Sequence, residues 1–469
     1  MKKAAIINAC GKYSKVILSL LVNAILSRIL LPEDYGIVAV ITVFSTFFIT
    51  FSDMGFGTAI IQKKELEKND IDHIYTFTVY ISVILMLVFI ICSFPIALFY
   101  QNKVYIPLGI LLSFSLLFNG LNMVPNGILN RDKKFISIAV RTVTVYIVSA
   151  AITVVLALMG AQYYAIAFFS IFSAFFQFIW NYKTTKPKFT CKVDFQSIKK
   201  VLNYSSYQFA FNVVNYFSRN LDNLLTGKLL GNKELGYYNK AYTLMLYPVN
   251  NLTGVITPVL HPILSEYQKQ FHIIYQKYMK IVRLLACMGI YIAPLCFLAS
   301  SEIITILFGD NWTDSIVCFQ LLSIAIIPQM LNSSAGSVFQ SIGNTKLLFI
   351  NSCINTLITV IGILIGIFVG KSIYVLSLCV AIAYICHFLT AFYMLIKMGF
   401  KVKISGFVKD LIPEIFMLAL MILGVALYPF HFENVFLSFG VKFVYLGLVF
   451  VIGLIVSKEY KLFVSIIKQ

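Results

Sequence analysis

The chain has 469 residues, of which 59% are hydrophobic and only 12% are charged, a balance that excludes an ordinary soluble domain. A net charge of +18 would suggest a nucleic-acid partner in a soluble protein. Here the basic residues fall in every second loop between apolar blocks. If these loops face the anionic inner leaflet of a membrane, their position explains the positive net charge. We therefore expect a membrane protein with no nucleic-acid partner.

Fourteen apolar blocks follow one another along the chain, each about long enough to span a bilayer as a helix. They lie at 8–30, 36–61, 73–100, 104–130, 135–160, 163–182, 203–230, 236–264, 281–308, 315–341, 346–370, 372–396, 408–430 and 436–457. With the N-terminus inside, most of the 37 basic residues lie on the inner side, and the outer loops hold only Lys103, Lys233 and Lys371. The sequence predicts an all-α, multi-pass membrane protein with 14 transmembrane helices and both termini in the cytoplasm.

An internal repeat appears when the chain is aligned with itself at an offset of 200 residues. Residues 28–36 then match residues 228–236 in their basic, apolar, acidic and glycine positions. Because six predicted spans separate the two segments, the repeats have the same orientation, as in transporters that place a substrate path between two halves. We expect two pseudo-symmetric six-helix lobes, 1–190 and 191–400, followed by two C-terminal helices and a cytoplasmic tail in 401–469.

Polar side chains recur at helical spacing in the first span of each repeat, so each set shares one helix face. The first set is Asn8, Lys12, Lys15, Ser19 and Asn23, and the second is Gln208, Asn212, Asn215, Arg219, Asp222 and Thr226. A charge facing lipid costs roughly 2.5–3.5 kcal/mol. The faces are either polar contacts between packed helices or the lining of a water-filled cavity. We favour the cavity, because a structural pair would not need so many consecutive polar turns.

Further residues are candidates for the same cavity. Arg141 and Lys240 lie within or near predicted spans and either line the cavity or are paired structurally. Asp53 and Asp222 are acidic residues set well within spans, which makes them candidates for ion coupling. Asp222 could instead neutralise Arg219, three residues away. We expect no catalytic residues, cofactor or metal site, because the outer loops are short and the cysteines form no CxxC pair.

Two motifs carry a resemblance to a known family. The first is Asp-Asn-Leu-Leu-Thr-Gly-Lys-Leu-Leu-Gly at 222–231 with Glu-Leu-Gly-Tyr-Tyr-Asn-Lys-Ala at 234–241. The second is Ser-Arg-Ile-Leu-Leu-Pro-Glu-Asp-Tyr-Gly at 27–36, followed by Ser-Asp-Met-Gly at 52–55. Both motifs resemble those of the polysaccharide transporters of the multidrug/oligosaccharidyl-lipid/polysaccharide exporter superfamily. The resemblance of the predicted spans to this family covers essentially the whole chain.

The resemblance implies a flippase that is not an enzyme and works in the bacterial cytoplasmic membrane. Its substrate would be undecaprenyl-diphosphate-linked oligosaccharide repeat units for capsule, exopolysaccharide or O-antigen synthesis. Transport would be ion-coupled alternating access in the lipid bilayer, and a polysaccharide polymerase or assembly machinery would be a partner. Three alternatives stay open: a peptidoglycan-precursor flippase, a multidrug exporter of the same superfamily, and a membrane glycan polymerase or ligase.

Overall fold

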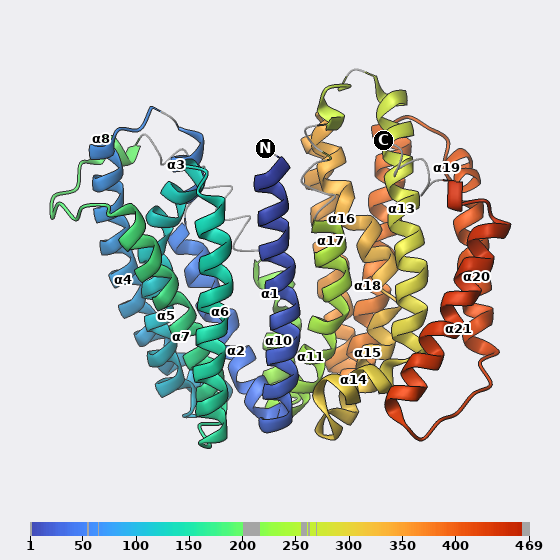
Figure 1. Cartoon of the computed structure of the whole chain (residues 1–469), viewed down its shortest axis with the longest axis horizontal. Helices are drawn as coiled ribbons and strands as arrows, with labels where there is room; N and C mark the ends of the chain where they lie inside the picture. Colours follow the sequence, from blue (N-terminus) through green and yellow to red (C-terminus); the bar gives the residue numbers. More distant parts are fainter. Residues whose placement is uncertain are drawn as a thin grey trace. The chain divides into compact units, whose positions relative to one another are not determined.

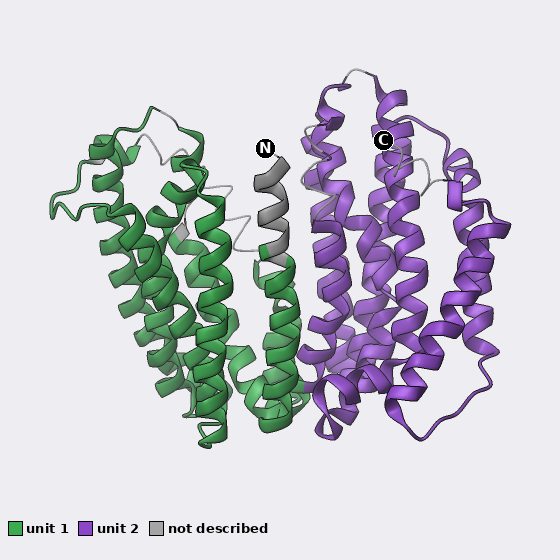
Figure 2. Cartoon of the chain, in the orientation of Figure 1, with its two compact units in different colours: residues 1–236 green, residues 237–469 purple. Residues whose placement is uncertain are grey.

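The structure, a computed structural model, describes residues 2–53, 56–63, 65–199, 216–254, 260, 263–268 and 270–461. All regular secondary structure in these residues is helical (Figure 1). The chain forms two compact units, Met1–Gly236 and Tyr237–Gln469, which are coloured separately in Figure 2. The predicted all-α fold is therefore confirmed for the part of the chain described.

Unit 1 is built from long apolar helices joined by short turns. Its helices are α1 (Lys2–Ile29), α2 (Pro32–Asp53), α3 (Phe56–Gln62), α4 (Lys68–Tyr100), α5 (Tyr105–Arg131), α6 (Phe135–Leu158), α7 (Tyr163–Thr185), α8 (Phe195–Lys199), α10 (Leu221–Leu229) and the first turn of α11 (Asn232–Pro248). Helix α5 packs against both α4 and α7, and α1 packs along α6. These contacts place α5, α6 and α7 around one interior.

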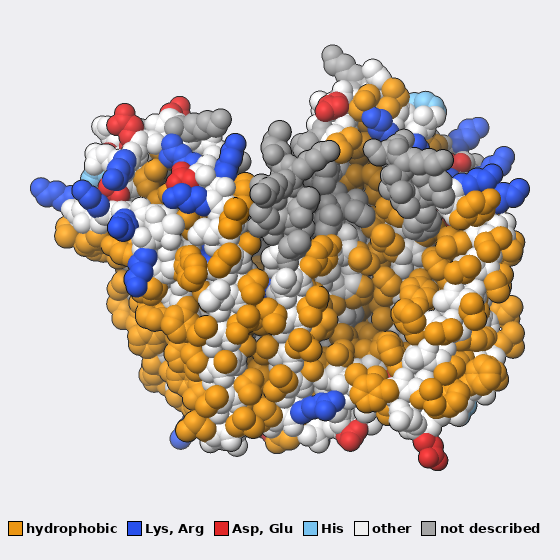
Figure 3. Space-filling model, viewed as in Figure 1, with side chains coloured by type: hydrophobic (Ala, Val, Ile, Leu, Met, Phe, Trp, Pro, Cys, Tyr) orange, Lys and Arg blue, Asp and Glu red, His pale blue; other side chains and the backbone are white. Residues whose placement is uncertain are grey.

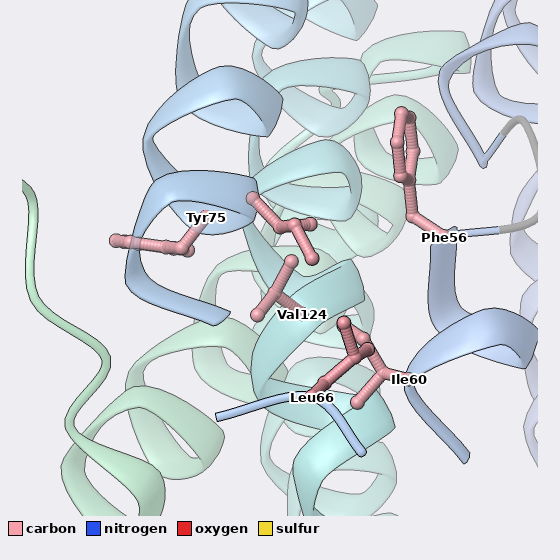
Figure 4. Close-up of a cluster of buried hydrophobic side chains, with 6 residues drawn as sticks. Phe56, Ile60, Leu66, Tyr75 and Val124 are labelled. Carbon is pink, nitrogen blue, oxygen red and sulfur yellow. The ribbon is translucent and has the colours of Figure 1, made fainter. Parts of the chain in front are cut away.

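A hydrophobic cluster holds the short helix α3 in place. Side chains of α3, α4, α5 and the turn before α4 meet there, as Figure 4 shows. The buried members are Phe56, Ile60, Leu66, Ile74, Tyr75 and Val124. Fully burying one such side chain contributes about 1.5–3 kcal/mol, so the cluster ties the short helix α3 to the two long helices.

Unit 2 contains the remaining helices. They are the rest of α11, η1 (Val249–Thr253), α13 (Phe271–Leu298), α14 (Ser300–Phe308), η2 (Asp310–Trp312), α15 (Thr313–Ser323), α16 (Ile326–Ser341), α17 (Thr345–Leu364), η3 (Ile365–Val369), α18 (Ile373–Tyr393), η4 (Met394–Gly399), α19 (Ile404–Asp410), α20 (Ile412–Ala426) and α21 (Val435–Val456). Helix α13 packs against α14, α15, α16, α20 and α21. It is therefore the helix around which this unit is organised.

Among the described residues, nine helices are long and apolar enough to cross a membrane, or ten if one bent pair is a single span. The bent pair corrects the predicted uninterrupted span 315–341: 310–323 and α16 meet at 55°. Pro328, in the first turn of α16, has no N–H to donate to the carbonyl of Ile324, so the helix breaks there. Hydrophobic side chains cover the sides of these helices in Figure 3. The protein is a multi-pass membrane protein, and the count of 14 spans stays a prediction.

The 200-residue offset recurs at the helix ends. Helix α1 ends at Ile29 and α2 begins at Pro32, while α10 ends at Leu229 and α11 begins at Asn232. Both turns therefore have the same length at the same place in the repeat. Matching sequence has produced matching local structure.

The first turns of α2 and α11 pack directly on each other within unit 1. A Cβ atom added to Gly36 would lie 1.7 Å from the carbonyl oxygen of Asn232. A Cβ added to Gly236, the residue at the repeat offset, would lie 1.9 Å from the carbonyl oxygen of Pro32. Only glycine allows two backbones to approach so closely. The contact is reciprocal, as expected for two turns that match in sequence and length.

The segment 186–199 lies along the first half of α4. Hydrogen bonds join the two from Ser197 Oγ to Asp70 Oδ1 (2.7 Å), from Lys188 N to Asp72 Oδ1 (2.8 Å), from Thr190 N to Thr76 Oγ1 (3.0 Å) and from Tyr80 OH to Cys191 O (3.0 Å). The Ser197 hydroxyl also lies 2.7 Å from Asp194 Oδ2 and shares its one hydrogen between the two carboxylates, which lowers the pKa of Asp194. Lys and Arg side chains gather around this end of unit 1 in Figure 3.

Candidate functional site

A buried arginine is the centre of a polar network inside unit 1. Arg141 lies two turns into α6 and is 5% exposed. Its Nη1 donates to Oδ1 of Asn126 on α5 at 3.1 Å and to Oδ1 of Asn181 on α7 at 2.7 Å. The amide of Asn181 in turn donates to Oδ1 of Asn122 on α5 at 2.7 Å. Three helices thus hold the guanidinium in one position.

Among the residues that the structure describes, no acid balances the positive charge of this guanidinium. A guanidinium stays protonated in proteins, and its two partners here are neutral amide oxygens. Among the described residues no carboxylate forms an ion pair with Arg141, and its Nε is buried without a hydrogen-bond partner. Buried charges are normally paired. The arrangement therefore has the chemistry of a site for an anion.

The sequence pointed to Arg141 but not to its partners. Asn122 and Asn126 are four residues apart on α5 and so lie on one face, and Asn181 lies near the end of α7. The spacing of Asn122 and Asn126 in an otherwise apolar block was the one sequence feature that could have indicated a polar site on α5. Nothing in the sequence pattern brings the asparagines of two helices to the arginine of a third.

The predicted polar face of α1 is described in part. Lys15 is exposed, while Ser19 and Asn23 are half-buried and joined by a 2.9 Å hydrogen bond from the Asn23 amide to the Ser19 carbonyl oxygen. Lys12 lies in α1, but its side chain is outside the described set, as is that of Asn8. Lys15 is thus an accessible cation on the predicted face.

The second polar face lies mostly outside the described residues, which do not include Gln208, Asn212 and Asn215. Arg219 is exposed, whereas Asp222 in α10 is 3% exposed and accepts a 2.8 Å hydrogen bond from the backbone N–H of Asn223. Arg219 and Asp222, both described, form no ion pair with each other. The opposition of the two polar faces across a cavity stays a prediction.

Two other candidates differ in their surroundings. Asp53 is the last residue of α2, and its side chain is not described. Lys240 on α11 is 6% exposed, and its ammonium lies over the rings of Phe308 (4.7 Å) and Trp312 (5.1 Å) in unit 2. This cation–π contact fixes the head of Lys240 against the turn after α14.

Comparison with known proteins places the chain in a family. The model of a family described as polysaccharide biosynthesis protein matches residues 25–317, more than half of the chain. The chain belongs to this family. The resemblance recognised in its sequence motifs is thereby confirmed.

Two curated relatives have names that refer to cell-surface polysaccharides. The teichuronic acid biosynthesis protein TuaB of Bacillus subtilis (strain 168) is 23% identical over 310 residues, which is 63% of this chain and 62% of TuaB. The lipopolysaccharide biosynthesis protein WzxC of Escherichia coli (strain K12) is 23% identical over 365 residues, 74% of this chain and 71% of WzxC. The match thus spans less than two thirds of TuaB.

Solved structures share the fold. The lipid II flippase MurJ, in an inward closed conformation, matches with a TM-score of 0.75 at 16% identity over 97% of this chain and 99% of that chain. An inward-facing multidrug resistance transporter of the MATE family matches with a TM-score of 0.64 at 15% identity, over 82% of this chain and 94% of that chain. At these identities the likeness is one of fold alone.

Proposed function

We propose that this protein is a flippase that moves undecaprenyl-diphosphate-linked oligosaccharide repeat units from the inner to the outer leaflet of the bacterial cytoplasmic membrane, without catalysing covalent chemistry. The units would serve capsule, exopolysaccharide or O-antigen synthesis. Family membership supports a role in polysaccharide biosynthesis. The observation that carries the substrate class is Arg141, a buried cation whose partners among the described residues are amides and include no acid.

The chemistry of this substrate fits that site. A diphosphate is an anion with several acceptor oxygens, and a guanidinium binds phosphate with short, charge-assisted hydrogen bonds. The asparagines that hold Arg141 can bind sugar hydroxyls through any donor or acceptor they have left. A multidrug exporter for cationic compounds would place acids in such a site, rather than a buried arginine held by amides.

We further propose that transport is alternating access coupled to a proton or sodium gradient. Asp53 or Asp222 would be the coupling carboxylate, and binding of the ion would change the charge of the substrate path. A ligand shifts the balance between two conformations only if it binds them unequally. The burial of Asp222 at 3% exposure supports its role, because a buried acid responds strongly to a bound cation.

The test is reconstitution of the purified full chain in liposomes with a defined lipid-linked oligosaccharide, scored by the substrate that becomes accessible on the far side. Wild-type protein should flip it. Arg141→Gln should lower the rate about tenfold or more, since a hydrogen bond to a charged group is worth roughly 1.5–3 kcal/mol. Arg141→Lys, which keeps the charge, should retain more activity than Arg141→Gln.

Two controls make the outcome decisive. Arg131→Gln removes a different guanidinium of unit 1, one that donates to the backbone carbonyl of Leu66 at 3.0 Å, and should leave flipping near the wild-type rate. Membrane levels of each variant exclude a loss of folding. If wild-type protein flips a peptidoglycan precursor but no lipid-linked repeat unit, the proposed substrate is wrong. If Arg141→Gln flips the substrate at the wild-type rate, Arg141 does not contact the substrate.

A further inference from the structure

A second charged cluster lies in unit 2 and contains none of the residues assigned to substrate or ion coupling. Three segments meet there: α13 with Arg283, α20 with Glu414, and the turn after α21 with Glu459. Arg283 Nε donates to Glu414 Oε1 at 2.8 Å, and its Nη2 donates to Glu459 Oε1. The carboxylate side chains are only 4% and 2% exposed. One guanidinium therefore serves two buried acids.

The hydrogen bonding of the two acids is incomplete. Oε2 of Glu414 and Oε2 of Glu459 are both buried without a hydrogen-bond partner. The thiol of Cys287, one turn beyond Arg283 on α13, lies beside them, and ligand atoms of Cys287, Glu414 and Glu459 are all within 4.8 Å of one another. Two buried oxygens on neighbouring acids therefore lack a hydrogen-bond donor.

Charge balance leads to the same conclusion. With both acids ionised, the cluster would carry two negative charges against one positive charge in a low-dielectric interior. Like charges sharing such a site oppose ionisation of the second group. One added proton makes the cluster neutral and gives the unpaired oxygens a donor. A metal ion fits less well, because Arg283 already places its positive charge against both carboxylates.

Within the described part of the chain, the neighbouring helices supply no second cation to this pair. Helix α16 has no charged residue, Asp314 of α15 accepts from Tyr374, and Glu302 of α14 pairs with Lys442 of α21. On α13 itself, Lys277 lies over the ring of Tyr267, His272 is hydrogen-bonded to Gln276, and Lys280 is exposed. On α19, Asp410 accepts a hydrogen bond from Tyr275, and Lys409 is exposed. Lys458 and Lys461, which flank Glu459 in the sequence, are exposed as well. Among the described residues, Arg283 is the sole cation paired with either acid.

We propose that Glu414 and Glu459 together bind one proton, shared between their carboxyl groups, and that it fastens α20 and the turn after α21 to α13. The predicted topology places this site at the cytoplasmic ends of these helices. Loss of the proton at alkaline pH would leave a net negative charge in the interior and weaken the attachment of the last two helices. The site thus makes the stability of unit 2 respond to cytoplasmic pH.

The experiment is infrared spectroscopy of the purified full chain between about pH 5 and about pH 9, a range in which unperturbed glutamates are ionised. Wild-type protein should show a carboxylic acid C=O band at neutral pH that disappears at high pH. Glu414→Gln and Glu459→Gln should each lack it, because the remaining glutamate ionises beside Arg283. Glu302→Gln, which removes an acid from a one-to-one pair with Lys442, should keep it.

Thermal unfolding provides a second measurement. The midpoint of wild-type protein should fall as the pH rises through the range where the band disappears, since the proton stabilises the folded state below that range. Glu459→Gln should show no such fall. Absence of a protonated carboxyl in wild-type protein at every pH, or an unchanged band in both glutamine variants, would overturn the proposal. Neither result depends on whether the protein flips a glycan.

Discussion

Adding one methyl group at Gly36 or Gly236 should destabilise unit 1, because the first turns of α2 and α11 have no room for it. The added Cβ would lie 1.7 Å from the carbonyl oxygen of Asn232 in the first case and 1.9 Å from that of Pro32 in the second. Each obstacle is backbone in the first turn of a helix. A side chain could rotate away, but here the two helices must separate.

The structure sets the size of the effect. The two backbones must move apart by roughly 1.5 Å before the added methyl group makes an ordinary contact, and a packed interior does not absorb such a shift without cost. Overpacking of this kind lowers the free energy of unfolding by about 1–3 kcal/mol, and we expect a loss at the upper end of that range. A glycine-to-alanine change in an unobstructed helix is instead favourable by about 0.5–1 kcal/mol. Gly440 in α21 and Gly336 in α16 have nothing within 4 Å of an added Cβ, so their alanine variants are matched controls.

The assay is thermal unfolding of the purified protein in one detergent, followed by the loss of the monodisperse peak in size-exclusion chromatography. Gly36→Ala and Gly236→Ala should unfold at lower temperature than wild type, while Gly440→Ala and Gly336→Ala unfold at the same or higher temperature. The double variant should lose less than the sum of the single losses, because one separation of the two turns relieves both clashes. If Gly36→Ala and Gly236→Ala match the controls, the close approach does not exist.

Two further predictions concern transport. Lys15→Gln and Arg219→Gln should each lower flipping of the lipid-linked substrate in liposomes with normal membrane insertion, because both cations are exposed on the predicted cavity faces; unchanged flipping by both variants would mean that neither contacts the diphosphate. When a pH or sodium gradient is imposed across the liposome membrane, the flipping rate of Asp222→Asn or of Asp53→Asn should no longer depend on that gradient. If the flipping rates of both variants respond to the gradients as the wild-type rate does, neither carboxylate is the coupling site.

Features carried by short stretches of sequence could be predicted. Apolar blocks of helix length gave most of the long helices, and the match of residues 28–36 with 228–236 anticipated the equal turns at Ile29–Pro32 and Leu229–Asn232. Such turns depend on glycine, proline and polar residues within a few positions of each other. A local signal is therefore enough to place them.

Features that depend on the meeting of distant segments could not be predicted. The sequence around Arg141 does not predict that asparagines on α5 and α7 accept hydrogen bonds from its guanidinium. Glu414 and Glu459 stand at helix ends in the sequence, where acids are normally solvated, and only the convergence of α13, α20 and the turn after α21 buries them. Periodicity shows which residues share a face, but it does not show which faces meet.

The segment 186–199 has a mechanical consequence. Its hydrogen bonds to α4 include backbone N–H groups of Lys188 and Thr190, so the connection out of α7 is not a slack tether. Tension applied to the chain beyond Lys199 is borne first by α4, along the row of side chains from Asp70 to Tyr80, before it reaches α7. The longest described helix of unit 1 therefore holds in place the segment through which the chain leaves α7.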